Sequence, residues 1–316
     1  MIRTSGLIKR YGSFTAVNGI NLNIPRGQIY GFLGPNGAGK TSTIMMLLGV
    51  SRPTAGEIRL FGELSTPGRL DLRRRIGVVP EKHPVGVWTW MTAGEYLSLF
   101  ADLFSVPHAR ERIDVLLEKV DLARFKSKRI REFSHGMTQK LSIIRALLHD
   151  PDILFLDEPI AGLDPIGIKQ VRDLVVSENR DGRTIFISSH QLSEMEKICD
   201  RVAIIFGGEL LVEATMHDLL SRVTVEREIH VELDKAPPDL PARIRELPFV
   251  HGCSVQGGTI IVKVAKEGDY RKELSERFFS LGLVPLSIAE KASSLEEAFI
   301  TITQDNIQAL AGRSRA

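Results

Sequence analysis

The stretch "QIYGFLGPNGAGKTSTIMMLLG", residues 28–49, contains a strand, a glycine-rich turn and a helix in direct succession. Its first part, 28–34, is a continuous apolar run typical of a buried strand. The turn "GPNGAGKT", 34–41, satisfies the phosphate-loop pattern at every defined position, and Gly49 is suited to cap the helix that follows. A chance match in this context is rare, so the stretch predicts a binding site for phosphate groups.

The chemistry of such a loop gives roles to its residues. Glycines let the backbone fold tightly enough for its N–H groups and the helix N-terminus to surround a β-phosphate. Lys40 would then reach the β- and γ-phosphates, and Thr41 would coordinate Mg²⁺. The predicted nucleotide-binding residues of the loop are Gly34, Pro35, Asn36, Gly37, Ala38, Gly39, Lys40, Thr41 and Ser42.

A second motif, "ILFLDEP" at 153–159, brings two carboxylates to the end of a buried strand. Adjacent strand residues point to opposite sides, so Asp157 and Glu158 need different roles. Asp157 would hold Mg²⁺ through water, and Glu158 would orient or deprotonate the attacking water. A charged helix start after a strand is the alternative, but beside a phosphate loop the pair predicts a Mg²⁺-dependent nucleoside triphosphatase.

Composition limits the remaining possibilities. The net charge of +2 is too small for an extended nucleic-acid footprint, and the basic run at 124–131 is typical of a solvated face, so no nucleic-acid partner is expected. Cys199 and Cys253 lie far apart in sequence, which favours a reducing compartment, the cytosol by default. No apolar run approaches the ~20 residues that span a bilayer, so a membrane role would require a partner.

The hydrophobic period changes along the chain. Strict alternation at 20–24 and 57–61 predicts half-buried antiparallel strands. From about 92 to 148 the period is helical, and buried strands then alternate with helices between 153 and 206, which predicts a parallel sheet with crossover helices. The segment from 153 to 206 therefore has the pattern of an α/β fold.

A further change near 222 marks the predicted domain boundary. The order βαββαβ follows, which resembles a ferredoxin-like unit of about 80 residues, while the last dozen residues have no partner pattern. The predicted organisation is a first domain over 1–222 with a helical subdomain at about 88–148, a small α+β domain over 223–304 and a flexible tail over 305–316.

Three motifs carry a family resemblance. They are "FSHGMTQKLSIIRALLHDPDILFLDEP" at 133–159, "AGLD" at 161–164 and "SSH" at 188–190. They resemble the LSGGQ signature, the D-loop and the switch-histidine strand of the ATP-binding cassette (ABC) family, in the order and spacing of that family over residues 3 to about 220. In the signature, Ser134 and Gly136 match, whereas Phe133, His135 and Met137 depart. The C-terminal unit, ending in "SSLEEAFI", resembles the small domain appended to ATPase subunits of two-gene ABC exporters.

The resemblance implies an α/β fold of the P-loop NTPase class, with a RecA-like parallel-sheet core, an antiparallel β subdomain, a helical subdomain and a small α+β C-terminal domain. It implies an ATP-hydrolysing subunit that dimerises on ATP and drives export through a separate membrane permease, at the cytoplasmic face of the membrane. Two alternatives are a soluble ABC ATPase acting on ribosomes or DNA and a regulatory ATP-binding module without turnover. The first usually has two cassettes or a coiled-coil insertion, and Glu158 and His190 argue against the second.

The resemblance also implies a site shared between two chains. Phosphoryl transfer needs charge stabilisation on the side of the γ-phosphate away from the loop, and no arginine finger is evident in the sequence. In the resembled family Ser134 and the N–H of Gly136 would serve from a second subunit, so two chains enclose two ATP molecules. A homodimer is the simplest arrangement, and a paralogous partner also fits. Asp164 would link the two sites, and His190 would contact the γ-phosphate and the attacking water.

Three further positions are interpreted through the resemblance. Tyr11 would stack on adenine, with a tyrosine that merely ends a strand as the alternative. Glu81 stands where the family has the glutamine of its Q-loop, and its carboxylate can supply an oxygen ligand to Mg²⁺. His135 replaces a glycine and either points away as a polar surface residue, the favoured interpretation, or contacts the nucleotide.

The two tryptophans, Trp88 and Trp90, follow Glu81 closely. In the resembled family the groove after the Q-loop receives a coupling helix of the membrane subunit, so 81–91 is the predicted contact with the permease. The alternative is that both rings pack inside the helical subdomain. Since alternating residues of an extended segment point in opposite directions, one ring inward and one outward is plausible.

Overall fold

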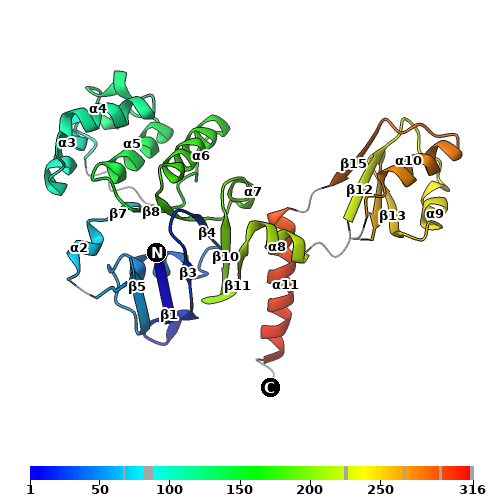
Figure 1. Cartoon of the computed structure of the whole chain (residues 1–316), viewed down its shortest axis with the longest axis horizontal. Coiled ribbons are helices and arrows are strands. Elements are labelled where there is room, and N and C mark those ends of the chain that lie inside the picture. The colour runs from blue at the N-terminus through cyan, green and yellow to red at the C-terminus, as the bar shows by residue number, and fades with distance from the viewer. Residues whose placement is uncertain (67, 82–87, 224–226, 266–267, 292–293, 314–316) are drawn as a thin grey trace. The chain divides into compact units, whose positions relative to one another are not determined.

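The structure is a computed structural model of the chain, and it describes residues 1–66, 68–81, 88–223, 227–265, 268–291 and 294–313 (Figure 1). The chain forms two compact units, the first of Met1–Met216 with Asn306–Ala316 and the second of His217–Asp305. Each unit has its own hydrophobic core. Among the described helices, none is both long enough and apolar enough to cross a membrane.

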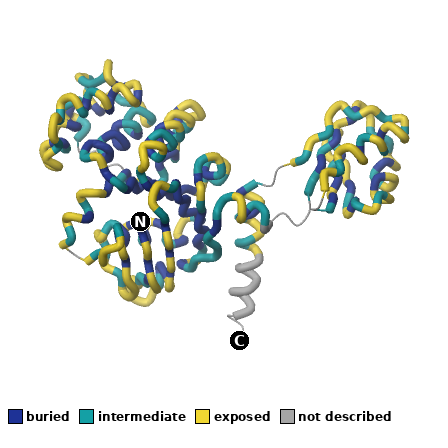
Figure 2. Tube along the Cα trace, in the orientation of Figure 1, coloured by how far each residue is buried: buried dark blue, intermediate teal, exposed yellow. Residues whose placement is uncertain are grey.

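Six strands form the central sheet of the first unit: β11 (Glu209–Thr215), β10 (Arg201–Phe206), β4 (Ile29–Leu33), β9 (Thr184–Ser189), β8 (Ile153–Asp157) and β7 (Ile76–Val79), in that spatial order. The pairs from β10 to β7 are parallel, as predicted, and β11 pairs with β10 in the antiparallel direction. Every residue of β4, β8 and β9 is buried (Figure 2), which explains their continuous apolar runs. Because parallel strands end at the same edge, the segments after β4, β8 and β9 meet there.

A second sheet of the first unit is antiparallel and contains β1 (Ile2–Tyr11), β2 (Phe14–Ile20), β3 (Asn23–Ile24), β5 (Ala55–Leu60) and β6 (Glu63–Leu64). The alternation predicted at 20–24 is confirmed in burial, because Ile20, Leu22 and Ile24 are all buried. The run is nevertheless divided between β2 and β3. Tyr11 and Phe14 are opposite partners across the turn that joins β1 to β2.

The helices of the first unit are α1 (Lys40–Leu47), α2 (Leu70–Arg73), α3 (Ala93–Phe104), α4 (Ala109–Lys119), α5 (His135–Leu147), α6 (Pro165–Arg180) and α7 (Leu192–Glu196). Helices α3, α4 and α5 pack on one another and form a helical subdomain (Figure 1). On α4 the residues Ile113, Leu116 and Leu117 are buried, as their helical spacing predicts. Thr92 begins α3 with a capping box that includes Glu95.

The second unit contains a βαββαβ fold made of β12 (Arg227–Glu232), α9 (Leu240–Arg245), β13 (Val250–Gln256), β14 (Thr259–Val264), α10 (Arg271–Ser280) and β15 (Ser287–Lys291). Its sheet is antiparallel with the order β13-β14-β12-β15, which is the ferredoxin-like arrangement. Leu240 and Ile244 of α9 and Leu274 and Phe278 of α10 pack with the strands in one core. Helix α8 (Met216–Val223) precedes this fold and α11 (Leu295–Arg313) follows it.

Helix α11 continues through 305–313, where the sequence predicted a loose tail. Ser294 specifies its start, because its Oγ accepts a hydrogen bond from the N–H of Glu297 (3.2 Å) and the Glu297 carboxylate accepts one from the N–H of Ser294 (3.3 Å). No glycine or proline occurs between Leu295 and Ala311. The helix therefore meets no residue that would break it before Gly312.

Candidate active site

The loop between β4 and α1 contains the predicted phosphate-binding residues. All three of its glycines are required by the backbone. A Cβ on Gly34 would lie 2.4 Å from the carbonyl oxygen of Ile205, and Gly37 and Gly39 have positive φ values of 79° and 106°, which favour glycine. Lys40 folds back over the loop, and its Nζ donates a hydrogen bond to the carbonyl of Gly34 (2.7 Å). Because Gly39 supplies no side-chain cap to α1, the N–H groups of the first turn of α1 are available to an anion.

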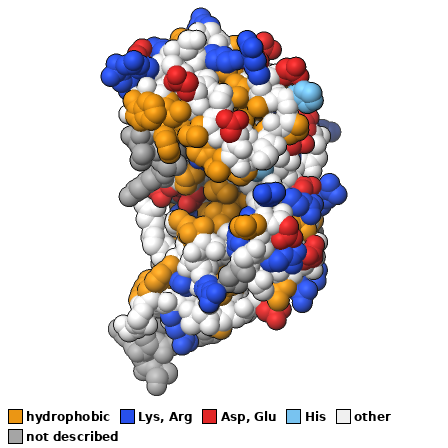
Figure 3. Space-filling view, turned by 90° about the vertical axis from the view of Figure 1, so that its left-hand side faces the viewer, with side chains coloured by type: hydrophobic (Ala, Val, Ile, Leu, Met, Phe, Trp, Pro, Cys, Tyr) orange, Lys and Arg blue, Asp and Glu red, His pale blue; other side chains and the backbone are white. Residues whose placement is uncertain are grey.

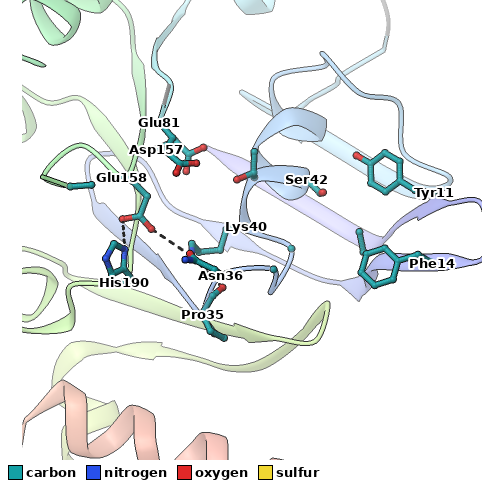
Figure 4. Close-up of a pocket in the computed structure, with 15 residues that line it drawn as sticks. Tyr11, Phe14, Pro35, Asn36, Lys40, Ser42, Glu81, Asp157, Glu158 and His190 are labelled. Atoms are coloured by element: carbon teal, nitrogen blue, oxygen red, sulfur yellow. Dashed lines mark hydrogen bonds and ion pairs between the residues drawn. The ribbon is translucent and has the colours of Figure 1, made fainter. Parts of the chain in front are cut away.

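The acidic pair lies at the end of the neighbouring strand β8. Asp157 is the last residue of the strand, and its Oδ1 accepts a hydrogen bond from Ser188 Oγ (2.5 Å). Glu158 follows with a left-handed backbone, φ 50°, and its N–H donates to the carbonyl of Ser188 (3.1 Å). The alternation that predicted opposite directions for the two side chains therefore ends at Asp157. Both side chains line the same cavity (Figure 4).

Glu158 is held between a cation and an imidazole (Figure 4). Its Oε2 lies 2.9 Å from His190 Nδ1, and its Oε1 lies 3.6 Å from Lys40 Nζ. The side chains of Glu158 and Lys40 are each only 8% exposed, whereas that of His190 is 54% exposed. Glu158 Oε1 is buried and has no hydrogen-bond partner within the described residues. This oxygen can therefore accept a proton or a hydrogen bond from a molecule that enters the cavity.

The cavity has a volume of about 460 Å³, which is in the usual range for small-molecule sites. Residues from both sheets and from the phosphate loop surround it. They are Tyr11, Phe14, Ala16, Pro35, Asn36, Gly37, Gly39, Lys40, Thr41, Ser42, Glu81, Asp157, Glu158, Ala161 and His190. The predicted loop residues Gly34 and Ala38 are buried and do not line the cavity.

Negative charge gathers at one side of the cavity. Burial raises the pKa of the Asp157 carboxyl, although the hydrogen bond from Ser188 opposes this shift. The nearby carboxylates of Glu81 and Glu158 raise the pKa of Asp157 further, and Lys40 lowers it. Figure 4 shows the Glu81 and Asp157 carboxylates on the same side of the site.

This arrangement suits a hard divalent cation, because carboxylate and hydroxyl oxygens are the ligands that Mg²⁺ prefers. Among the described residues, no group of three or more His, Cys, Asp or Glu side chains is arranged to hold a metal ion alone. Thr41 and Ser42 add hydroxyl groups to the lining. The residues present therefore fit a Mg²⁺ ion that is shared with phosphate oxygens, rather than one enclosed by protein ligands.

Two aromatic rings lie at the other end of the cavity, beyond Ser42 (Figure 4). Tyr11 is 50% exposed and Phe14 is 62% exposed, and both line the cavity. Tyr11 was predicted at this position, whereas Phe14 was missed. The signal that could have revealed Phe14 is its place directly after the turn that follows Tyr11, since an exposed aromatic ring there would share the same surface.

Besides Gly34 and Ala38, three predicted nucleotide-binding residues outside the loop do not line the cavity of this chain. Ser134 is exposed and caps α5, since its Oγ accepts a hydrogen bond from the N–H of Met137 (3.2 Å). Gly136 lies in the first turn of the same helix. Asp164 is exposed and caps α6, where it accepts a hydrogen bond from the N–H of Gly167 (2.7 Å). The side chains of Ser134 and Asp164 thus begin two helices and remain open to solvent.

His135 is an exposed residue that does not line the cavity, which agrees with its favoured interpretation as a polar surface residue. Its Nε2 lies 3.1 Å from the carbonyl oxygen of Ala161 in the predicted D-loop. The histidine therefore contacts a neighbouring loop of its own chain.

The tryptophans differ in exposure. Trp90 is 63% exposed, whereas Trp88 is only partly exposed and Met91 is buried. Backbone hydrogen bonds tie this segment to the basic run, from Arg131 N–H to the Thr89 carbonyl (3.0 Å) and from Ile130 N–H to the Met91 carbonyl (2.9 Å). Residues 82–87 of the predicted permease contact lie outside the described residues.

Comparison with known proteins connects this site to a family. A family model described as ABC transporter matches residues 17–161. The bacitracin transport ATP-binding protein BcrA of Bacillus licheniformis is 40% identical over 304 residues, which are 96% of this chain and 97% of that protein. The Nod factor export ATP-binding protein I of Ralstonia nicotianae is 33% identical over 307 residues, 96% of this chain and 94% of its own length.

A solved structure agrees with these relatives. The ATP-binding subunit of an ABC transporter superposes with a TM-score of 0.64 at 28% identity and covers 70% of this chain and 92% of its own. The fold, the cavity and the relatives together establish that the chain belongs to the ABC transporter family, as an ATP-binding subunit that hydrolyses ATP.

Proposed function

We propose that two copies of this chain close head to tail on two ATP molecules and drive export through a separate membrane permease. One observation supports the proposed dimer. Lys40, Glu158 and His190 converge in one cavity, while Ser134 and Asp164 are exposed at helix starts outside it. The exposed N-terminus of α5 is a suitable anion site, so it would meet the γ-phosphate held by a second chain. A paralogous ATPase would satisfy the same geometry.

Within each site, the proposal gives one role to each charged group. Lys40 binds the β- and γ-phosphates, and Glu158 orients the attacking water and accepts its proton. His190 holds Glu158 Oε2 at 2.9 Å and is exposed enough to reach the γ-phosphate. Mg²⁺, when bound, would neutralise phosphate charge, with Thr41, Glu81 and Asp157 as the residues that hold it. Tyr11 would stack on adenine.

A surface on the first unit supports a permease partner. Hydrophobic side chains gather in a hollow on the face shown in Figure 3. Helix α3 lies on this side of the unit, and its exposed Leu99 and Leu103 are separated by one helical turn. Trp90, in the turn before α3, adds a large exposed ring of the kind that dominates protein interfaces. The relative whose name specifies export supports the outward direction. The proposed position of this chain is the cytoplasmic face of the membrane.

The experiment that tests the dimer uses Glu158→Gln. This change keeps the size of the side chain and removes the proton acceptor, so ATP should stay bound and the closed dimer should accumulate. Sedimentation or light scattering with and without ATP measures the mass. Glu158→Gln combined with Lys40→Ala is the control and should remain monomeric. A Glu158→Gln chain that stays monomeric with ATP, beside a wild type that hydrolyses ATP as a monomer, would contradict the proposal.

A further inference from the structure

A hydrogen bond joins the start of α5 to the segment between β8 and α6. His135, the first residue of α5, has its Nε2 3.1 Å from the carbonyl oxygen of Ala161. Because a carbonyl only accepts, the Nε2 atom must donate and must therefore carry a proton. Gly162 lies under the ring, since a Cβ added there would be 3.4 Å from His135 Nε2. Such a Cβ would only be in van der Waals contact with the imidazole, and glycine is favoured at 162 by its left-handed φ of 72°.

The two ends of this bond belong to different ATP sites of the proposed dimer. Ala161 lines the cavity of its own chain, and its N–H donates to the carbonyl of Glu158 (3.2 Å). His135 directly follows Ser134, which is exposed and caps the helix that would face the nucleotide of the other chain. A continuous set of contacts therefore runs from the Glu158 backbone to the α5 N-terminus.

We propose that His135 couples the two ATP sites, so that nucleotide in the cavity of one chain favours the α5 position that completes the site of the other chain. This inference rests on the proposed dimer. His135 is a positioning residue, because it acts through Ala161 and Ser134 and does not itself line the cavity. A glycine at 135 would leave the Ala161 carbonyl without this donor, so the departure from the family signature creates the link.

The test measures ATP hydrolysis by the full chain over a range of ATP concentrations. The wild type should respond cooperatively, because two coupled sites bind with reciprocal effects. His135→Ala should give a hyperbolic curve, with half-saturation raised roughly 2- to 10-fold for the loss of one neutral hydrogen bond. His135→Gln should restore part of the cooperativity, since its amide can also donate to a carbonyl.

Two controls separate coupling from structure. His108→Gln changes an exposed histidine that does not line the cavity and should leave the hydrolysis curve unchanged. Unfolding temperatures of the His135 variants without nucleotide should fall by no more than about 2–4 °C, the effect of losing ~1 kcal/mol. A purely structural role would not make the cooperativity depend on a donor at 135.

Three results would overturn the coupling: wild-type cooperativity in His135→Ala, a His135→Gln chain as hyperbolic as His135→Ala, or a wild type that dimerises but responds hyperbolically. These results are distinct from failure of the proposed function. That failure would appear as a Glu158→Gln chain that does not dimerise with ATP.

Discussion

At the scale of single residues, Asp157 shows how the site holds charge that the fold alone disfavours. Burial and the carboxylates of Glu81 and Glu158 all raise its pKa. The folded chain therefore binds the proton of the Asp157 carboxyl group more tightly than the unfolded chain does. As the pH rises from the unfolded pKa through the raised folded pKa, ionisation of Asp157 lowers stability, and the full penalty is present above the folded pKa.

Asp157→Asn should remove this penalty while keeping an oxygen that accepts the hydrogen bond from Ser188. We expect the variant, without nucleotide, to have a higher melting temperature than the wild type at neutral pH. The difference should shrink as the pH falls, because wild-type Asp157 is then protonated in the folded and unfolded states. Thermal unfolding at several pH values measures this. A variant that melts at or below the wild-type temperature at neutral pH would show that the carboxylate is not destabilising.

Phe14 should contribute to binding of the base beside Tyr11. Phe14→Ala should raise the Kd for ATP about fivefold, which is the effect of losing ~1 kcal/mol of stacking. The Kd for GTP should rise by a similar factor, since stacking discriminates little between bases. Equilibrium binding of both nucleotides gives the ratio, with Tyr11→Phe as a control that keeps its ring. An unchanged Kd would exclude Phe14 from the base site.

At the scale of elements, three helices begin where the nucleotide chemistry is proposed. Helix α1 starts after Gly39 without a side-chain cap, whereas Ser134 and Asp164 cap α5 and α6. The caps are therefore both structural and, in the proposed dimer, functional. Substitution of Ser134 can separate the two roles.

Ser134→Asp should keep the helix and lose the function. Aspartate is as good an N-cap as serine, so the free energy of unfolding should change by less than ~0.5 kcal/mol. Its negative charge would oppose the γ-phosphate of the partner's ATP, and we expect hydrolysis to fall by at least tenfold, on the order of 1.4 kcal/mol in the barrier. Unfolding curves and turnover measured on one preparation test both parts. Ser134→Asn, a neutral cap, is the control, and equal turnover in the two variants would contradict a phosphate contact.

The elements also show what the sequence could reveal. Continuous apolar runs predicted β4, β8 and β9 correctly, because strands buried on both faces need no alternation of apolar and polar residues. Helix α11 was missed beyond 304, because the helical spacing of Ile307, Leu310 and Ala311 was not recognised there.

The residue types and spacing of the candidate site could be predicted, but its local geometry could not. The left-handed backbone of Glu158 and the contact between His135 and Ala161 depend on segments brought together only by the fold. The place of Phe14 in the site could not be predicted for the same reason, because its position beside Tyr11 depends on the tight turn between β1 and β2.

At the scale of the whole molecule, the tryptophans separate into an exposed ring and a partly covered one. Trp90, with Leu99 and Leu103, belongs to the surface proposed to meet the permease. If this ring anchors the contact, Trp90→Ala should lower affinity for the membrane subunit about 30-fold, as a hot-spot loss of ~2 kcal/mol would. ATP hydrolysis by the isolated chain should be unchanged.

Purification from detergent-solubilised membranes tests this surface. The wild type should recover a membrane protein, and Trp90→Ala should lose it. Phe279→Ala, which truncates an exposed ring in the second unit, is the matched control and should retain the partner. Recovery of ribosomes or DNA in place of a membrane protein would instead favour the soluble ABC ATPase.

The left-handed backbone of Glu158 has a consequence for engineering. A residue with a Cβ at this φ costs about 1–2 kcal/mol relative to glycine, and the buried carboxylate adds a desolvation cost. A library selected only for thermal tolerance would therefore enrich glycine at 158 and discard the proposed catalytic base. For this protein, improved heat resistance and retained turnover have to be screened together.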